Sequence, residues 1–160
     1  MKLYLNPPSP YARKVRLLIH EKGAAARVAE ETVAAMEDPA ALHEANPLGK
    51  VPAIEDNGQV LNESGAILQY LLEKDGNGKL EPKPGSAARG HYLHWFHFAE
   101  ATMMVPIGNI AQHSFIRPED KRIPQVAAEA VESTQKMLGI LEKELAGKDY
   151  ICGSEFTAAD

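Results

Sequence analysis

The sequence holds little of what several classes of protein require. Its 160 residues include one cysteine, Cys152, so an intrachain disulfide is impossible and a reducing, cytoplasmic compartment is expected. Lys and Arg total 17 against 22 Asp and Glu, a formal net charge of -5, and no basic run offers a footprint for nucleic acid. Every apolar stretch is interrupted well before the roughly 20 residues that a membrane span needs, so no membrane partner is expected.

What is present is the balance of a soluble globular protein, with 44% hydrophobic and 24% charged residues. The chain is long enough for one medium domain or two small ones. The apolar pattern changes near the middle of the chain, after a stretch rich in glycine and proline. We therefore predict an α/β domain over residues 1–75, a linker over 76–86 and an all-α domain over 87–160.

In the first half, strand and helix patterns alternate. Ser9 suits the N-cap of a helix, Pro10 its first position and Gly23 the left-handed residue after its end. The Asn57-Gly58 pair predicts a β-hairpin, and Asp38 is expected to cap a short helix. The crossover should give a parallel strand pair and the hairpin an antiparallel edge. The expected elements span residues 2–5, 10–22, 29–33, 39–44, 51–62 and 63–74.

The second half reads as helical throughout. Two long helices are expected, over residues 87–115 and 119–145. Near the end, Thr157 and Asp160 have the spacing of a capping box, in which Asp160 reaches back to the Thr157 N–H. A capping box announces a helix, yet the sequence stops at its fourth residue, so we expect a functional protein that is longer than this chain.

The most informative stretch runs from Asn46 to Ser64. Val51-Pro52 opens a short apolar strand, the hairpin follows, and Glu63-Ser64 lies where the second strand gives way to a helix. Backbone N–H groups at such a junction carry partial positive charge and suit a carboxylate. An ordinary hairpin leading into an ordinary helix is the simpler interpretation of each piece taken alone.

In this order and spacing, the stretch resembles the glutathione-binding half of the cytosolic glutathione transferases, and among them the bacterial type with a serine active site. The resemblance implies a thioredoxin-like first domain with a mixed four-stranded sheet, and a central helix after the capping box. It implies that Val51 precedes a cis-proline, Pro52, and pairs its backbone with the cysteine of glutathione. It further implies that Glu63 and Ser64 hold the γ-glutamyl end.

Lys50 is a reasonable partner for the glycyl carboxylate of glutathione; the alternative is a solvated loop lysine. Conjugation needs a thiolate near neutral pH, whereas a free cysteine thiol has a pKa near 8.5. Ser9 stands between a strand and a helix N-terminus, where its hydroxyl can donate to the sulfur and favour the anion. Ser9 could instead serve only as a helix cap, and Tyr4 and Tyr11 are the alternative hydroxyl donors.

The resemblance also implies a pocket for an apolar electrophile, which we expect Tyr11, Met103, Ile107 and Ile110 to line. His91, His94 and His97 follow one another at intervals of three, but aromatic residues between them favour packing over a metal site, and no metal is expected. Arg13, Lys14 and Arg16 make one helical turn basic, which we interpret as a solvated or dimer-facing surface.

The leading functional interpretation is a detoxifying glutathione transferase, a homodimer that conjugates the thiolate of its co-substrate glutathione to a small apolar electrophile. Two alternatives stay open. One is a non-enzymatic binding or regulatory protein with the same fold. The other is a glutathione-dependent reductase of disulfides or peroxides, which the same residues could support.

Overall fold

The computed structural model describes residues 1–33, 39–74 and 78–160. The chain divides into two compact units, Met1–Lys79 and Leu80–Asp160, which we call the N-terminal unit and the helical unit. The expected cap at Asp38 and the start of the predicted linker, residues 76 and 77, lie outside the described residues. The exact linker, 76–86, therefore stays a prediction.

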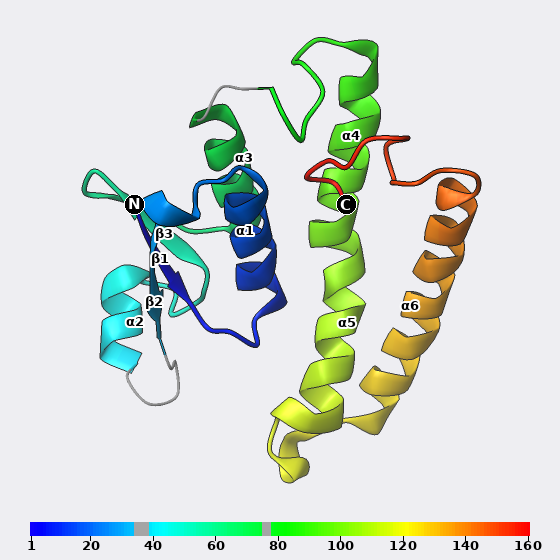
Figure 1. The fold of residues 1–160 in the computed structure, drawn as a ribbon. Helices are drawn as coiled ribbons and strands as arrows, with labels where there is room; N and C mark the ends of the chain where they lie inside the picture. The colour runs from blue at the N-terminus through cyan, green and yellow to red at the C-terminus, as the bar shows by residue number, and fades with distance from the viewer. Residues whose placement is uncertain (34–38, 75–77) are drawn as a thin grey trace. The chain divides into compact units, whose positions relative to one another are not determined.

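The N-terminal unit is built on a mixed four-stranded sheet with the order β2-β1-β3-β4 (Figure 1). β1 and β2 pair in parallel, whereas β1–β3 and β3–β4 pair antiparallel. Figure 1 shows α1 and α3 on one face of the sheet and α2 on the other. The elements are β1 (Lys2–Leu5), α1 (Pro10–Glu21), η1 (Ala25–Arg27), β2 (Ala29–Thr32), α2 (Pro39–Ala45), β3 (Ala53–Asp56), β4 (Gln59–Leu61) and α3 (Ser64–Lys74).

Local sequence signals explain the ends of α1. Ser9 has extended backbone angles and its side chain accepts a hydrogen bond from the Ala12 N–H, while Gly23 has φ +62° after the last turn. Val15 is fully buried, and Leu18 and Ile19 are 5% and 3% exposed, so one apolar stripe of the helix faces the core. The predicted start and stop of this helix are confirmed.

The helical unit begins with α4 (Ala87–His97) and continues through a π-helical segment, η2 (Phe98–Met103), into α5 (Met104–Ala111) and a second π-helical segment, η3 (Gln112–Ile116). This whole segment is helical, as expected. The first π segment ends three residues before Pro106, whose ring has no N–H and displaces the carbonyl four residues earlier, within that segment. Tyr92, Trp95 and Phe96 form the buried aromatic centre of this unit.

The predicted helix over residues 119–145 begins too early. Only Glu119–Lys121 forms a short 3-10 turn, η4, and the long helix α6 spans Pro124–Leu145. Pro124 takes the first helical position and keeps the residue before it, Ile123, extended with ψ 98°. The predicted start thus overlooked that a proline disfavours helical backbone in the residue that precedes it.

The predicted capping box is formed. One carboxylate oxygen of Asp160 accepts from the Thr157 N–H at 2.9 Å. The other oxygen accepts from the Ile151 N–H at 2.7 Å, and the Ala158 N–H donates to Leu80 O at 2.8 Å. The final residues are thereby attached to the rest of the helical unit. The predicted fold class, an α/β thioredoxin-like domain followed by an all-α domain, is confirmed.

Candidate functional site

Ser9 lies where β1 has ended and α1 begins. Its N–H donates to Asn6 O at 2.9 Å, which closes the turn that leads into the helix. Its hydroxyl oxygen accepts from the Ala12 N–H at 3.3 Å. A serine hydroxyl has one proton of its own, and the capping bond uses only an acceptor lone pair. The capping and donor interpretations of Ser9 are therefore compatible, because the hydroxyl proton can be donated to a second partner.

The loop before Val51 is organised by Asn46, whose side chain is only 1% exposed. The Asn46 amide donates to Lys50 O at 2.7 Å, and its carbonyl oxygen accepts from the Leu48 N–H at 3.0 Å. The Val51-Pro52 peptide bond is cis, as predicted. The loop therefore reaches Val51 with its backbone fixed from within by one buried side chain.

Gly49 lies inside this loop with φ +63°, a conformation that favours glycine. A Cβ added there would stand 2.9 Å from a ring carbon of His43, whose Nδ1 lies 3.1 Å from Pro47 O. Because a carbonyl oxygen can only accept, the Nδ1 position of His43 carries the proton. The imidazole thus covers the glycine and holds the loop from the α2 side.

Glu63 and Ser64 lie at the start of α3. Glu63 has φ +68° and accepts the first helical hydrogen bond from the Ile67 N–H at 2.9 Å. Ser64 is the first helical residue and is 4% exposed. The first N–H groups of a helix have no intrahelical acceptor and carry partial positive charge, so this end of α3 suits an anionic group.

The sheet register brings these segments to one edge. Tyr4 pairs with Ala53 and Ile54 pairs with Leu61. Beyond those pairs, β1 runs toward the loop of Ser9, β3 is entered from Val51-Pro52, and β4 runs toward Glu63. All three therefore leave the sheet at the same end, and the Asn62 side-chain amide donates to the Asn46 carbonyl oxygen at 2.9 Å across it.

The alternative hydroxyl donors differ in their contacts. Tyr4 donates its hydroxyl to Glu55 Oε2 at 3.1 Å within the sheet, so this phenol already has an acceptor. Tyr11 is half-buried in the first turn of α1, and Lys14 Nζ lies 5.7 Å from the centre of its ring. Burial lowers the pKa of Lys14 to about 8. Lys14 is thus less solvated than its exposed neighbour Arg13, and the interpretation of this helical turn as a solvated or dimer-facing surface stays a prediction.

The remaining predicted residues belong to the helical unit. Met103 ends η2, while Ile107 and Ile110 lie on successive turns of α5, and all three are half-buried. They share one helical face because three and four residues separate neighbours on that face. The structure fixes their place within the helical unit, and the electrophile pocket they were predicted to line with Tyr11 stays a prediction.

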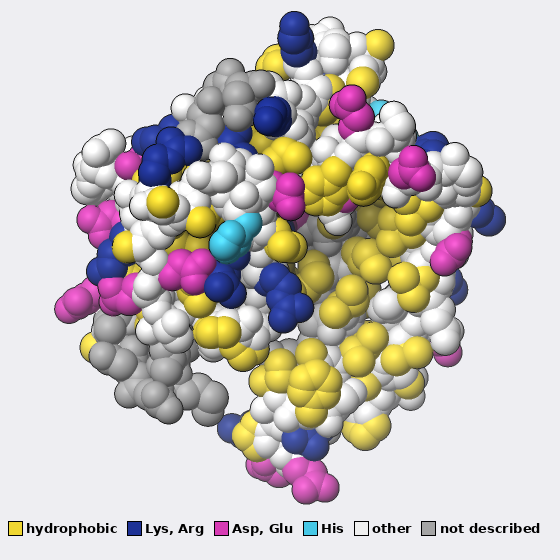
Figure 2. Space-filling view, viewed as in Figure 1, with side chains coloured by type: hydrophobic (Ala, Val, Ile, Leu, Met, Phe, Trp, Pro, Cys, Tyr) yellow, Lys and Arg dark blue, Asp and Glu magenta, His cyan; other side chains and the backbone are white. Residues whose placement is uncertain are grey.

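The helical unit also presents exposed apolar side chains over α5 and α6 (Figure 2). A groove of about 440 Å³ runs between these helices, lined by Val105, Pro106, Val126, Ala130 and Met137 among others. Val105 is 59% exposed on α5, and Val131 and Leu138 are 41% and 46% exposed on α6. This face is a candidate contact surface for another protein chain.

The histidines of α4 take part in local packing. His91 Nε2 lies 3.3 Å from Glu144 Oε1, and His94 stacks on Phe98 with ring centres 6.2 Å apart. Within residues 1–33, 39–74 and 78–160, no cluster of three or more His, Cys, Asp or Glu side chains could hold a metal ion. Over the same ranges, none of the helices is both long and apolar enough to cross a membrane.

The sequence did not identify Asn46 as a site residue, although Asn46 is the first residue of the informative stretch that ends at Ser64. The only local signal is that Asn46 precedes Pro47, since asparagine commonly bonds to backbone two residues on. Its third partner, Asn62, is 16 residues away. Such a contact follows from the fold and from no short pattern.

Comparison with known proteins adds an independent line of argument. Residues 3–82 match the family described as "Glutathione S-transferase, N-terminal domain". Residues 103–160 match the family described as "Glutathione S-transferase, C-terminal domain". The first match covers nearly all of the N-terminal unit and extends three residues into the helical unit, and the second lies within the helical unit.

Among curated proteins, the chain is 29% identical to glutathione S-transferase 3 of Zea mays over 164 aligned positions, covering all of this chain and 73% of that protein. It is 31% identical to the glutathione S-transferase-like protein OpS6 of Beauveria bassiana, covering all of this chain and 74% of that protein. Among solved structures, a glutathione transferase family member from Pseudomonas fluorescens with two glutathione molecules bound superposes with a TM-score of 0.86. That structure is 28% identical, and the match covers 99% of this chain and 71% of the other.

Proposed function

The chain belongs to the glutathione S-transferase family, and we propose that it conjugates the thiolate of glutathione to a small apolar electrophile. The observation that supports this most directly is the common edge of the sheet. At this edge lie the segments that carry the Ser9 hydroxyl, the Val51-Pro52 backbone and the start of α3 at Ser64. The similar Pseudomonas fluorescens structure contains bound glutathione, which favours that ligand here.

In the proposed complex, glutathione lies extended along this edge. The backbone of Val51 pairs with the cysteinyl residue, and Lys50 balances the glycyl carboxylate. Ser64 and the N-terminus of α3 take the γ-glutamyl carboxylate, because unsatisfied N–H groups and the helix dipole favour an anion there. Glu63 is exposed beside it and offers a carboxylate to the γ-glutamyl ammonium.

Ser9 is the proposed catalytic residue. Its hydroxyl donates a hydrogen bond to the glutathione sulfur, and the N-terminus of α1 adds a positive field, so the thiol releases its proton to water more readily. The thiolate then attacks an electrophilic carbon, a C–S bond forms, and the leaving group departs with its electron pair. Ser9 acts as a donor and not as a nucleophile.

The electrophile is proposed to lie against Tyr11, Met103, Ile107 and Ile110, which offer apolar and adaptable side chains. We further propose that the protein is a cytoplasmic homodimer with a role in detoxification. The exposed apolar face over α5 and α6 supports an assembly of this kind, since such a face is rare on a monomer (Figure 2).

The proposal is tested by turnover with 1-chloro-2,4-dinitrobenzene, whose chloride is the leaving group. Wild type should accelerate conjugation, and Ser9→Ala should lower kcat by about a hundredfold, the usual cost of losing one oriented donor. Glutathione affinity should change much less. Ser86→Ala is the matched control, because Ser86 also precedes a helix but makes no side-chain cap bond.

Two outcomes would contradict the proposal. Glutathione binding without conjugation of any electrophile would favour a non-enzymatic protein of the same fold. Turnover only with disulfides or peroxides, with oxidised glutathione as product, would assign the site to a reductase.

A further inference from the structure

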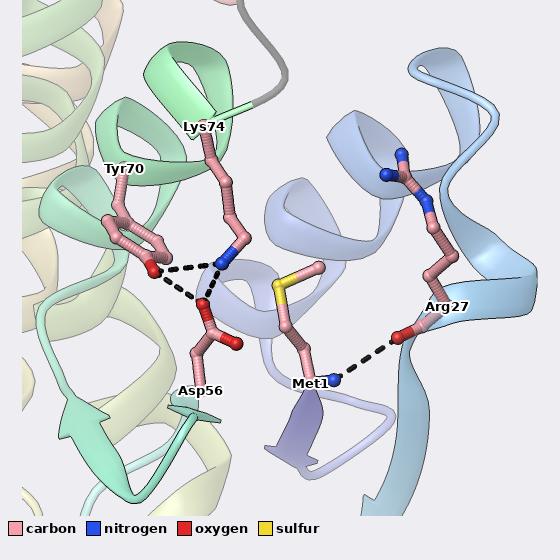
Figure 3. A network of polar contacts seen from close by, with 5 residues as sticks. All are labelled: Met1, Arg27, Asp56, Tyr70 and Lys74. Carbon is pink, nitrogen blue, oxygen red and sulfur yellow. Dashed lines mark hydrogen bonds and ion pairs between the residues drawn. The ribbon is translucent and has the colours of Figure 1, made fainter.

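A buried carboxylate joins the sheet to α3 far from Ser64. Asp56 closes β3 and is 8% exposed. One of its oxygens, Oδ2, accepts from the Tyr70 hydroxyl and from the Lys74 ammonium, and Lys74 Nζ lies 3.2 Å from the Tyr70 oxygen (Figure 3). Tyr70 and Lys74 are four residues apart and so share one face of α3. We call these three residues the Asp56 clamp.

The clamp is charged at neutral pH. Hydrogen bonds from Lys74 and then from Tyr70 hold the pKa of Asp56 below its usual value, and the bond to Asp56 raises the pKa of Lys74. Charge-assisted hydrogen bonds are shorter and more directional than contacts between neutral groups. The clamp therefore fixes the position of α3 along its own axis more closely than apolar contacts do.

The other contacts of α3 are mostly of the non-directional kind. Beyond Ser64 at its start, its buried face consists of leucine and isoleucine, which pack against the sheet and α1 mainly through non-directional contacts. The Lys22 ammonium donates to Leu72 O at 3.3 Å, which is a second polar attachment near the same end. Directional contacts at the C-terminal half thus help to fix the axial register of the helix.

The clamp and the proposed glutathione site are the two ends of the same pair of elements. β3 begins directly after Val51-Pro52 and ends at Asp56, while α3 begins at Ser64 and carries Tyr70 about 9 Å further along its axis. A helix of this length moves as one body. Release of the clamp would therefore move Ser64 relative to the Val51 backbone.

We propose that Asp56 is a positioning residue for glutathione, which holds the start of α3 at the distance from Val51-Pro52 that the γ-glutamyl and cysteinyl parts of the ligand require. This inference rests on the proposed function, because it takes glutathione as the ligand. Tyr70 and Lys74 act as the two attachments through which Asp56 controls the helix. The clamp does not act on the ionisation of the glutathione thiol, which is assigned to Ser9.

The test is a comparison of Asp56→Asn, Tyr70→Phe and Lys74→Met. Each should raise the Kd and the KM for glutathione, Asp56→Asn by about tenfold, because small displacements far from the reacting atoms are costly. The KM for the electrophile and kcat at saturating glutathione should stay unchanged. The ultraviolet titration of the bound thiol should also stay unchanged, since Ser9 is not disturbed.

Glu31→Gln is the matched control. It removes a carboxylate charge on β2, in the same sheet, that pairs with Lys2 of β1, and it should leave the glutathione Kd as in wild type. If Asp56→Asn fails to fold, Tyr70→Phe and Lys74→Met still decide, because each keeps most of its side chain. A lower melting temperature with an unchanged glutathione Kd in both would overturn the inference.

Failure of the proposed function looks different. In that case wild type either does not bind glutathione by calorimetry or binds it without conjugating an electrophile. The positioning role is contradicted only when wild type binds and the clamp variants bind equally well.

Discussion

The side chain of Asn46 offers a perturbation whose size can be worked out from the structure. Asn46→Ala removes three hydrogen bonds, to Lys50 O at 2.7 Å, from Leu48 N at 3.0 Å and from Asn62 Nδ2 at 2.9 Å. A buried hydrogen bond contributes about 1 kcal/mol net, so the free energy of unfolding should fall by about 3 kcal/mol. The same change frees the loop that carries Val51, and the glutathione Kd should rise as well.

Urea denaturation followed by circular dichroism measures the first effect, and calorimetry measures the second. Asn62→Ala removes only one of the three bonds and should cost about 1 kcal/mol. The double variant should then show a coupling of about 1 kcal/mol between Asn46 and Asn62, because both single changes remove the same bond. A loss below about 1 kcal/mol for Asn46→Ala, with unchanged glutathione affinity, would refute the account of this loop.

Three further changes give separate tests. Ser64→Ala should weaken glutathione binding by about 0.5–1.5 kcal/mol in calorimetry, the value of one hydrogen bond, and equal affinity would remove Ser64 from the site. Gly49→Ala should destabilise the fold, because its φ is +63° and the new Cβ would stand 2.9 Å from the His43 ring; an unchanged urea midpoint would contradict this. Lys14 has a pKa lowered from 10.5 to about 8, so between these pH values the unfolded chain binds more protons than the folded one and stability rises with pH. Lys14→Met should be the more stable protein at pH 7, and its advantage over wild type should shrink between about pH 8 and 10; a constant gap would mean that Lys14 is solvated.

The local parts of the fold were predicted correctly from the sequence. Ser9, Pro10 and Gly23 mark the ends of α1 through cap chemistry that acts over a few residues, and the Asn57-Gly58 turn predicts the hairpin in the same way. The start of the long helix was predicted too early, at residue 119, because its amphipathic pattern extends to the N-terminal side of Pro124. The helix starts only at Pro124, because the proline restricts the backbone of Ile123.

The contacts that organise the site could not be predicted. Asn46 bonds to Asn62, 16 residues away, and Asp56 bonds to Tyr70 and Lys74 across the sheet and helix. Each depends on the register of β3 and β4 and on the rotation of α3, which no short pattern specifies. The candidate site residues were named from their order along the chain, while the side chains that hold their segments in place emerged only from the fold.

The central claim is that Ser9 favours the thiolate of bound glutathione. Ultraviolet difference titration of the bound thiol measures this directly, since the thiolate absorbs and the thiol does not. In wild type saturated with glutathione, the bound thiol should titrate with a midpoint well below the pKa of about 8.5 of a free cysteine thiol. In Ser9→Ala the midpoint should return toward that value. A midpoint in wild type equal to that of free glutathione, or identical midpoints in the two proteins, would contradict the account.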